Sequence, residues 1–178
     1  MSGLAVPAPH AAPAEAAAPD DPFERMLWLL GRLNYTWTNT ESLLIHLVAG
    51  LARTDKESAT VIFLTLGSST ARLSLVRRLA KLERVDAACR DEVLALCRDF
   101  EAVLKLRNRY NHCIYAFDEA GRASTILMRV QDRPDTLRIG RKDALDEASL
   151  GRVANALADL RTVNTEIWSL IARHGFPS

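Results

Sequence analysis

The chain has 178 residues, of which 48% are hydrophobic and 25% charged, and its formal net charge is +1. This length and composition favour one globular domain with a core of its own, and the near-zero charge provides no overall field that would attract DNA or a membrane surface. No apolar run reaches the roughly 18 residues that a membrane span needs, and the N-terminus lacks the pattern of a secretory signal. We therefore expect a cytoplasmic protein without membrane association.

The three cysteines of the chain, Cys89, Cys97 and Cys113, form no C-x-x-C pair. An odd number without that spacing favours neither a disulfide framework nor a zinc site. We expect free thiols in a reducing compartment, no metal site and no cofactor.

The first residues differ in composition from the rest of the chain. Residues 1–21 are rich in Ala and Pro and contain almost no large apolar side chain, so we expect a disordered tail. Asp21 can cap a helix, Pro22 suits its first position, and Glu24 lies where a capping box requires an acid. We expect residues 22–178 to form a single helical domain.

Hydrophobic residues then recur at helical spacing as far as about Arg53. They are Leu27, Leu30, Trp37, Leu44, Val48 and Leu51. The polar residues Asn34 and Glu41 lie on the same stripe. The pattern predicts one long helix, loosened near residues 36–40, where β-branched residues gather.

A second helical region is expected over residues 57–82, with residues 67–69 as a kink or break. A third helix is expected to begin near Asp86, and its buried seam follows alternating steps of four and three residues. The seam consists of Cys89, Val93, Leu96, Phe100 and Val103. The next seam position is Arg107. A buried guanidinium is costly unless it is paired or hydrogen-bonded, so Arg107 requires a partner. Glu41 on the first stripe is one candidate, and a solvated Glu41 is the other interpretation of that residue.

The hydrophobic period changes after His112. Short strands are expected at residues 114–117, 124–130 and 136–139, with turn residues between them. A last helix is expected from about Lys142 or Asp143 to Arg173, ended by glycine and proline. The predicted fold class is therefore all-α, a bundle of four to five helices with a small β-hairpin inserted before the last helix.

The end of the third helix carries the one constellation with recognisable chemistry. Asn108 lies four residues before His112, so its amide can orient the imidazole from the same helix face. A histidine can move protons at an RNA 2′-hydroxyl or leaving 5′-oxygen, and an arginine such as Arg107 can brace the phosphate. Serine-nucleophile, metalloprotease and phosphate-loop motifs are missing from the sequence.

Here the chain resembles the HEPN superfamily (higher eukaryotes and prokaryotes nucleotide-binding domains). The hallmark of that family is an Arg, a polar residue that is often Asn, a few further residues and a His, late in a core helix of a four- to five-helix bundle. Arg107, Asn108 and His112 match this pattern, and the resemblance covers residues 23–175. It includes an acidic residue, Glu41, on a long first helix. The second helix contributes Ser69 and Arg72 to the same resemblance.

The resemblance implies that Arg107, Asn108 and His112 are catalytic, that Arg109 and Arg72 bind substrate, and that Glu41 supports them. Many HEPN-like proteins are metal-independent endoribonucleases, often toxins with an antitoxin or defence effectors, and they work as homodimers. A homodimer would also supply the second histidine that acid–base cleavage of RNA uses. Two other interpretations stay open: a module that binds nucleotide, RNA or protein without cleavage, and a structural role for the motif at the helix end.

Overall fold

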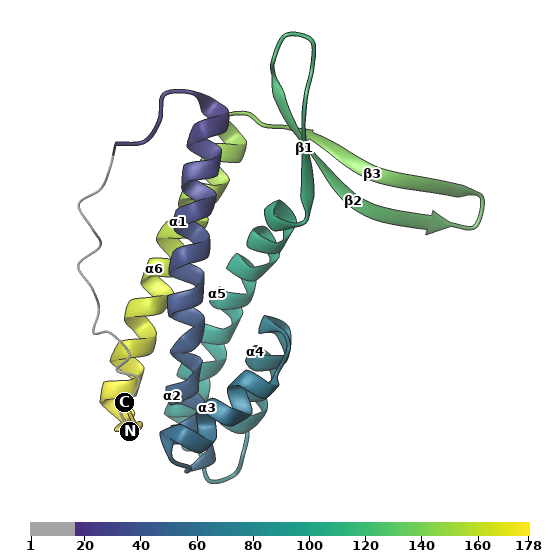
Figure 1. Cartoon of the computed structure of the whole chain (residues 1–178). Helices are drawn as coiled ribbons and strands as arrows, with labels where there is room; N and C mark the ends of the chain where they lie inside the picture. Colours follow the sequence, from purple (N-terminus) through teal and green to yellow (C-terminus); the bar gives the residue numbers. More distant parts are fainter. Residues whose placement is uncertain (1–16) are drawn as a thin grey trace.

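The computed structural model describes residues 17–178, except for the side chains of residues 129, 131, 133 and 139. A run of helices is followed by three strands and a last long helix (Figure 1). The elements are α1 (Pro22–Ser42), α2 (Leu44–Ala52), α3 (Lys56–Thr65), α4 (Ser69–Ala80), α5 (Ala87–Asn111), β1 (Cys113–Phe117), β2 (Ala123–Arg133), β3 (Thr136–Ala144) and α6 (Glu147–His174). The tail expected at residues 1–21 lies mostly outside the described residues.

Most helix boundaries agree with the local signals. Asp21 caps α1 by accepting a hydrogen bond from the Glu24 amide at 2.9 Å, and Asp86 caps α5 in the same way. The predicted break in the second helical region separates α3 from α4. The first helix, however, is divided at Leu43, beyond the predicted residues 36–40, where the Leu43 amide donates to the Thr40 carbonyl and tightens the turn.

The core lies between α1, α5 and α6, which run side by side as the longest helices (Figure 1). Trp37 from α1 and Phe100 from α5 meet with their ring centroids 4.3 Å apart. The predicted seam of α5 is buried throughout, and the stripe of the first helix is buried apart from Leu27, which is 48% exposed. Among the described residues, no helix is long and apolar enough to cross a membrane.

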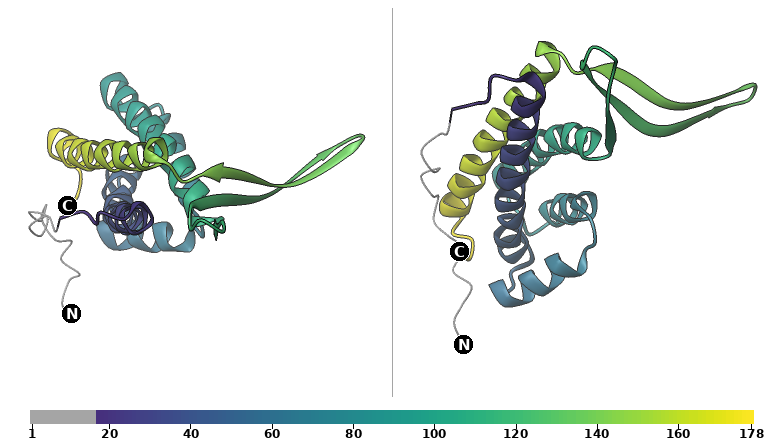
Figure 2. Two further views of the ribbon diagram at one scale, coloured as in Figure 1. Left: turned by 90° about the horizontal axis from the view of Figure 1, so that it is seen from above. Right: turned by 45° about the horizontal axis from the view of Figure 1, so that its top comes forward.

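The three strands form an antiparallel sheet in the order β1-β2-β3. The protein is mostly helical, as predicted, but it is not purely all-α, and the inserted element is a three-stranded sheet rather than a single hairpin. Residues 142–144 extend β3, and α6 therefore begins at Glu147 rather than at Lys142 or Asp143. The distal part of β2 and β3 projects from the helices as a two-stranded arm (Figure 2). The change of hydrophobic period after His112 and the turn residues predicted these strands, but the length of the strands depends on cross-strand pairing.

The chain after α6 folds back onto α2. Gly175 ends α6 in the left-handed conformation, with φ of 60°, as a C-terminal glycine commonly does. The Phe176 ring then lies directly against Gly50, and the Pro177 carbonyl accepts a hydrogen bond of 2.7 Å from Nδ1 of buried His46. His46 is therefore a hydrogen-bonded histidine of the core.

The contact between Gly50 and Phe176 predicts the effect of one added methyl group. A Cβ at position 50 would overlap the Phe176 ring, so Gly50→Ala should displace the C-terminal segment and lower the free energy of unfolding by about 1–2 kcal/mol. Gly31→Ala is the matched control, because no atom would meet its Cβ in α1, and it should stabilise the helix by about 0.5–1 kcal/mol. Urea unfolding of both variants measures the difference, and equal effects would contradict the contact.

The environment of His46 predicts a dependence of stability on pH. Burial lowers the pKa of His46 below its usual 6.5, although the hydrogen bond to the Pro177 carbonyl raises it in part. The folded state thus disfavours the protonated imidazole, and the unfolded chain binds more protons once the pH falls below about 6.5. The free energy of unfolding should decrease there, and by less in His46→Gln, when urea midpoints are compared at pH 7.5 and 5.5. An identical decrease in both proteins would exclude His46 as the cause.

Candidate functional site

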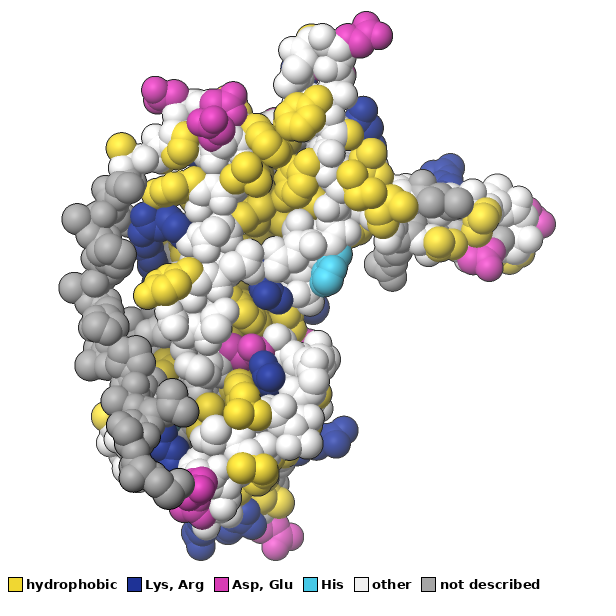
Figure 3. All heavy atoms as spheres, in the orientation of Figure 1, with side chains coloured by type: hydrophobic (Ala, Val, Ile, Leu, Met, Phe, Trp, Pro, Cys, Tyr) yellow, Lys and Arg dark blue, Asp and Glu magenta, His cyan; other side chains and the backbone are white. Residues whose placement is uncertain are grey.

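A cavity of about 320 Å³ lies where the N-terminus of α4 faces the end of α5. Its lining consists of Gly67, Ser68, Ser69, Thr70, Arg72, Arg107, Asn108 and His112. Figure 3 shows this face of the molecule hollowed between the sheet and the region of α3 and α4, with a histidine side chain at the surface. Four of the predicted site residues therefore share one cavity: Arg72, Arg107, Asn108 and His112.

Arg107 is the half-buried charge of this cavity. Its Nε donates to Asn34 Oδ1 at 3.0 Å, its Nη1 donates to Asn108 Oδ1 at 3.3 Å, and its guanidinium carbon lies 5.4 Å from the centroid of the Trp37 ring. These partners are neutral, and no carboxylate forms a salt bridge with Arg107 among residues 17–178. The guanidinium is held in place while its charge stays available to an anion.

The predicted pairing of Glu41 with Arg107 is wrong. Glu41 is 8% exposed, and its Oε2 instead accepts a hydrogen bond of 2.8 Å from Arg72 Nη1. Arg72 also donates from Nε to the Phe63 carbonyl at 3.3 Å and stacks over the Phe63 ring, 4.2 Å from its centroid. Glu41 therefore supports the wall of the cavity by fixing Arg72, and the positive charge of Arg72 is balanced there.

Asn34 is the site residue that the sequence interpretation missed. Its Oδ1 accepts hydrogen bonds from Arg107 and from Asn111 Nδ2, the latter at 2.9 Å. Asn34 and Glu41 lie on the same predicted stripe, seven residues or about two helical turns apart, so either could have been the partner of Arg107. Asn34 is the actual partner because helix packing places this part of α1 against the end of α5, where Arg107 lies.

His112 caps the C-terminus of α5 with an exposed side chain. Its backbone N–H donates to the Asn108 carbonyl at 3.1 Å, but its ring forms no hydrogen bond with any part of the chain that the structure describes. The expected amide contact from Asn108 is therefore not formed, since the Asn108 side chain accepts from Arg107. The imidazole is free to meet a ligand in the cavity.

The opposite wall of the cavity is the first turn of α4. Ser68 caps this helix by accepting a hydrogen bond of 3.2 Å from the Ala71 amide. The amides of Ser69 and Thr70 precede the first helical hydrogen bonds, and the first turn contains no acidic residue. A helix N-terminus of this kind attracts anions, and here it faces the unpaired charge of Arg107.

Arg109 lies outside the cavity, contrary to its predicted role in binding. Its Nη2 forms a salt bridge of 2.8 Å with Asp143 Oδ2, and its guanidinium lies over the Tyr110 ring. Arg141 reaches the other oxygen of Asp143 at 3.3 Å. Arg109 therefore connects α5 with β3, because a residue two positions beyond Arg107 projects from another side of the helix.

Comparison of the chain with protein-family models, with curated proteins and with solved structures finds no match.

The pair between Arg72 and Glu41 predicts a large effect on stability. Removing the arginine leaves a nearly buried carboxylate without a partner, so Arg72→Ala should lower the free energy of unfolding by about 2–4 kcal/mol. Arg77→Ala on the same helix is the control, because its salt bridge with Glu101 is more exposed and should contribute at most about 1 kcal/mol. Similar losses in both variants, measured by urea unfolding, would contradict the assigned role of the buried pair.

Proposed function

We propose that the protein is an HEPN-like, metal-independent endoribonuclease. The observation that carries the proposal is that Arg107 and His112 line one cavity, opposite the N-terminus of α4. An unpaired guanidinium and free helical amides are suited to hold a phosphate, and an exposed imidazole is suited to move its protons. The resemblance of Arg107, Asn108 and His112 to the family motif is the reason to propose that this phosphate belongs to RNA.

Cleavage of RNA by this route requires two proton transfers, one from the 2′-hydroxyl and one to the leaving 5′-oxygen. A base removes the proton of the RNA 2′-hydroxyl, and the 2′-oxygen attacks the adjacent phosphorus. The bond from phosphorus to the 5′-oxygen breaks, and an acid protonates that oxygen, which leaves a 2′,3′-cyclic phosphate and a 5′-hydroxyl. His112 serves as base or acid, while Arg107 and the α4 amides stabilise the charge on the phosphate oxygens.

A homodimer would complete this chemistry, because each chain contributes one histidine to its cavity and the reaction uses both a base and an acid. Exposed hydrophobic side chains occur in the elements that precede and follow the cavity residues along the chain. In α3, Val61 is 62% and Leu64 is 66% exposed, and in β1, Ile114 is 51% exposed. Exposed hydrophobic side chains can support a protein contact, so we propose that a second copy covers those of α3 and β1. A toxin or defence role with a partner antitoxin follows only from the family resemblance.

Cleavage of end-labelled RNA in EDTA tests the proposal. The wild-type chain should cleave, His112→Ala should be slower by about 10²- to 10⁴-fold, and the products should end in 2′,3′-cyclic phosphate. Lys105→Ala is the control, because Lys105 is exposed on α5 and does not line the cavity, so its loss should leave cleavage unchanged. The stability of His112→Ala should stay within about 0.5 kcal/mol of the wild type, since its exposed ring has no partner to lose. The mass of the active species, measured by light scattering, tests the dimer.

Binding without cleavage is the alternative function, and the same variants distinguish it. If wild type and His112→Ala both fail to cleave but bind labelled RNA, the cavity is a binding site only. In that case Arg107→Ala should weaken binding and lower the salt dependence by about one phosphate contact, whereas the exposed Lys105→Ala on the same helix should change neither. A chain that neither binds nor cleaves RNA would contradict both functions.

A further inference from the structure

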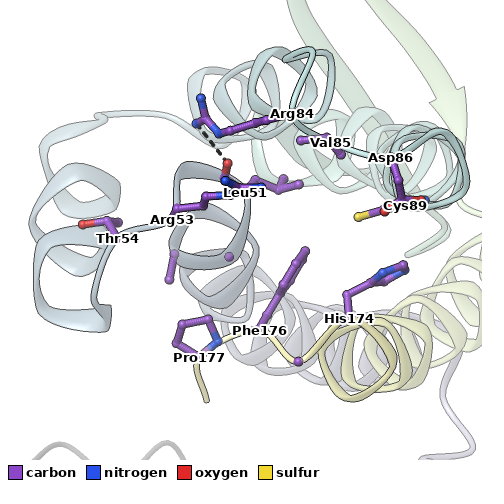
Figure 4. A pocket seen from close by; sticks show the side chains of 13 residues that line it. Leu51, Arg53, Thr54, Arg84, Val85, Asp86, Cys89, His174, Phe176 and Pro177 are labelled. Carbon is purple, nitrogen blue, oxygen red and sulfur yellow. Dashed lines mark hydrogen bonds between the residues drawn. The ribbon is translucent and has the colours of Figure 1, made fainter.

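Three side chains with metal-binding atoms meet at the other end of α5. The ligand atoms of Asp86, Cys89 and His174 all lie within 4.8 Å of one another. They line one side of a second cavity of about 400 Å³, which is bounded by the ends of α2, α5 and α6 (Figure 4). One oxygen, one sulfur and one nitrogen donor at this spacing could together hold a transition-metal ion.

These three side chains come from the start of α5 and the end of α6. Asp86 is the N-cap of α5, and its Oδ1 accepts a hydrogen bond of 2.9 Å from the amide of Cys89 one turn later. That bond leaves the second carboxylate oxygen for another partner. Cys89 is only 3% exposed, and within residues 17–178 its thiol forms no hydrogen bond. His174 is the last residue of α6, directly before the left-handed turn at Gly175.

The surroundings of His174 match the second layer of a metal site. Nε2 of His174 lies 3.4 Å from Glu92 Oε2, and the same oxygen accepts a hydrogen bond of 2.7 Å from Arg173. Histidines that bind metals commonly donate their other ring N–H to a carboxylate in this way. Arg84, which also lines the cavity, points away from Cys89 and donates to the Leu51 carbonyl (Figure 4).

We propose that Asp86, Cys89 and His174 bind a Zn²⁺ ion, with water from the adjoining cavity as the fourth ligand. Three protein ligands and one open position are a common tetrahedral arrangement for zinc. On binding, the Cys89 thiol releases its proton to solvent, so that one thiolate and one carboxylate neutralise the charge of the ion. The ion would clamp the C-terminal end of α6 to the start of α5.

This zinc site is independent of the proposed ribonuclease. The two cavities lie at opposite ends of α5, whose 25 residues span about 37 Å at 1.5 Å per residue. The sequence did not predict a zinc site because Asp86 and Cys89 are far from His174 along the chain. Cleavage in EDTA and metal binding can therefore succeed or fail separately.

Titration of the untagged full-length chain with Co²⁺, a spectroscopic substitute for Zn²⁺, tests the site. The wild type should bind one Co²⁺ with a thiolate-to-cobalt absorption band and the visible spectrum of a tetrahedral site, and Zn²⁺ should displace it. Cys89→Ser should lose the band, while Cys113→Ser, which removes a half-buried thiol elsewhere, should keep it. Glu92→Gln should weaken binding by about 10- to 100-fold without abolishing it.

Asp86→Asn is a second variant that should fold normally, because asparagine also caps helices and should preserve the start of α5. With its circular dichroism unchanged, this variant should bind Co²⁺ more weakly than the wild type. His112→Ala should bind Co²⁺ like the wild type, since it belongs to the other cavity. The absence of a thiolate band in the wild type, or its survival in Cys89→Ser, would overturn the proposal.

Discussion

The guanidinium of Arg107 at the edge of the core is the constraint on which the candidate site depends. Its position on the seam of α5 removes it from much of the solvent, and a charge in that place needs hydrogen-bond partners. Asn34 and Asn108 supply amide oxygens, and Trp37 supplies a ring face. Neutral partners meet the need for hydrogen bonds without cancelling the charge, which is the condition for attracting an anion.

Arg72 and Arg107, the two arginines of the cavity, have different roles because their hydrogen-bond partners differ in charge. Arg72 is balanced by Glu41 and therefore acts as a link between α1 and α4. That link sets the first turn of α4 opposite the end of α5, so that helical amides and Arg107 face the same space. Since the wall depends on an ion pair with little access to solvent, the geometry of the cavity and the stability of the domain are coupled.

Polar side chains that could bind a ligand lie at both ends of α5. At one end His112 closes the helix beside the cavity of the proposed ribonuclease, and at the other Asp86 caps it and faces His174. Backbone groups at helix termini lack helical partners, so polar residues gather there for structural reasons first. Where such residues from two elements converge, as they do in both places, binding of a ligand becomes possible.

Features that depend on neighbours along the chain could be predicted from the amino-acid order alone. They are the caps at Asp21 and Asp86, the seam of α5 with Arg107 on it, and the change to strands after His112. Periodicity and capping are local, so they can be read without a fold. The partners that these groups contact became known from the three-dimensional structure. The pairing of Glu41 with Arg72, the place of Arg109 outside the cavity and the approach of the α4 amides depend on how helices pack, because each joins residues that are distant in sequence or separated by a rotation about the helix axis.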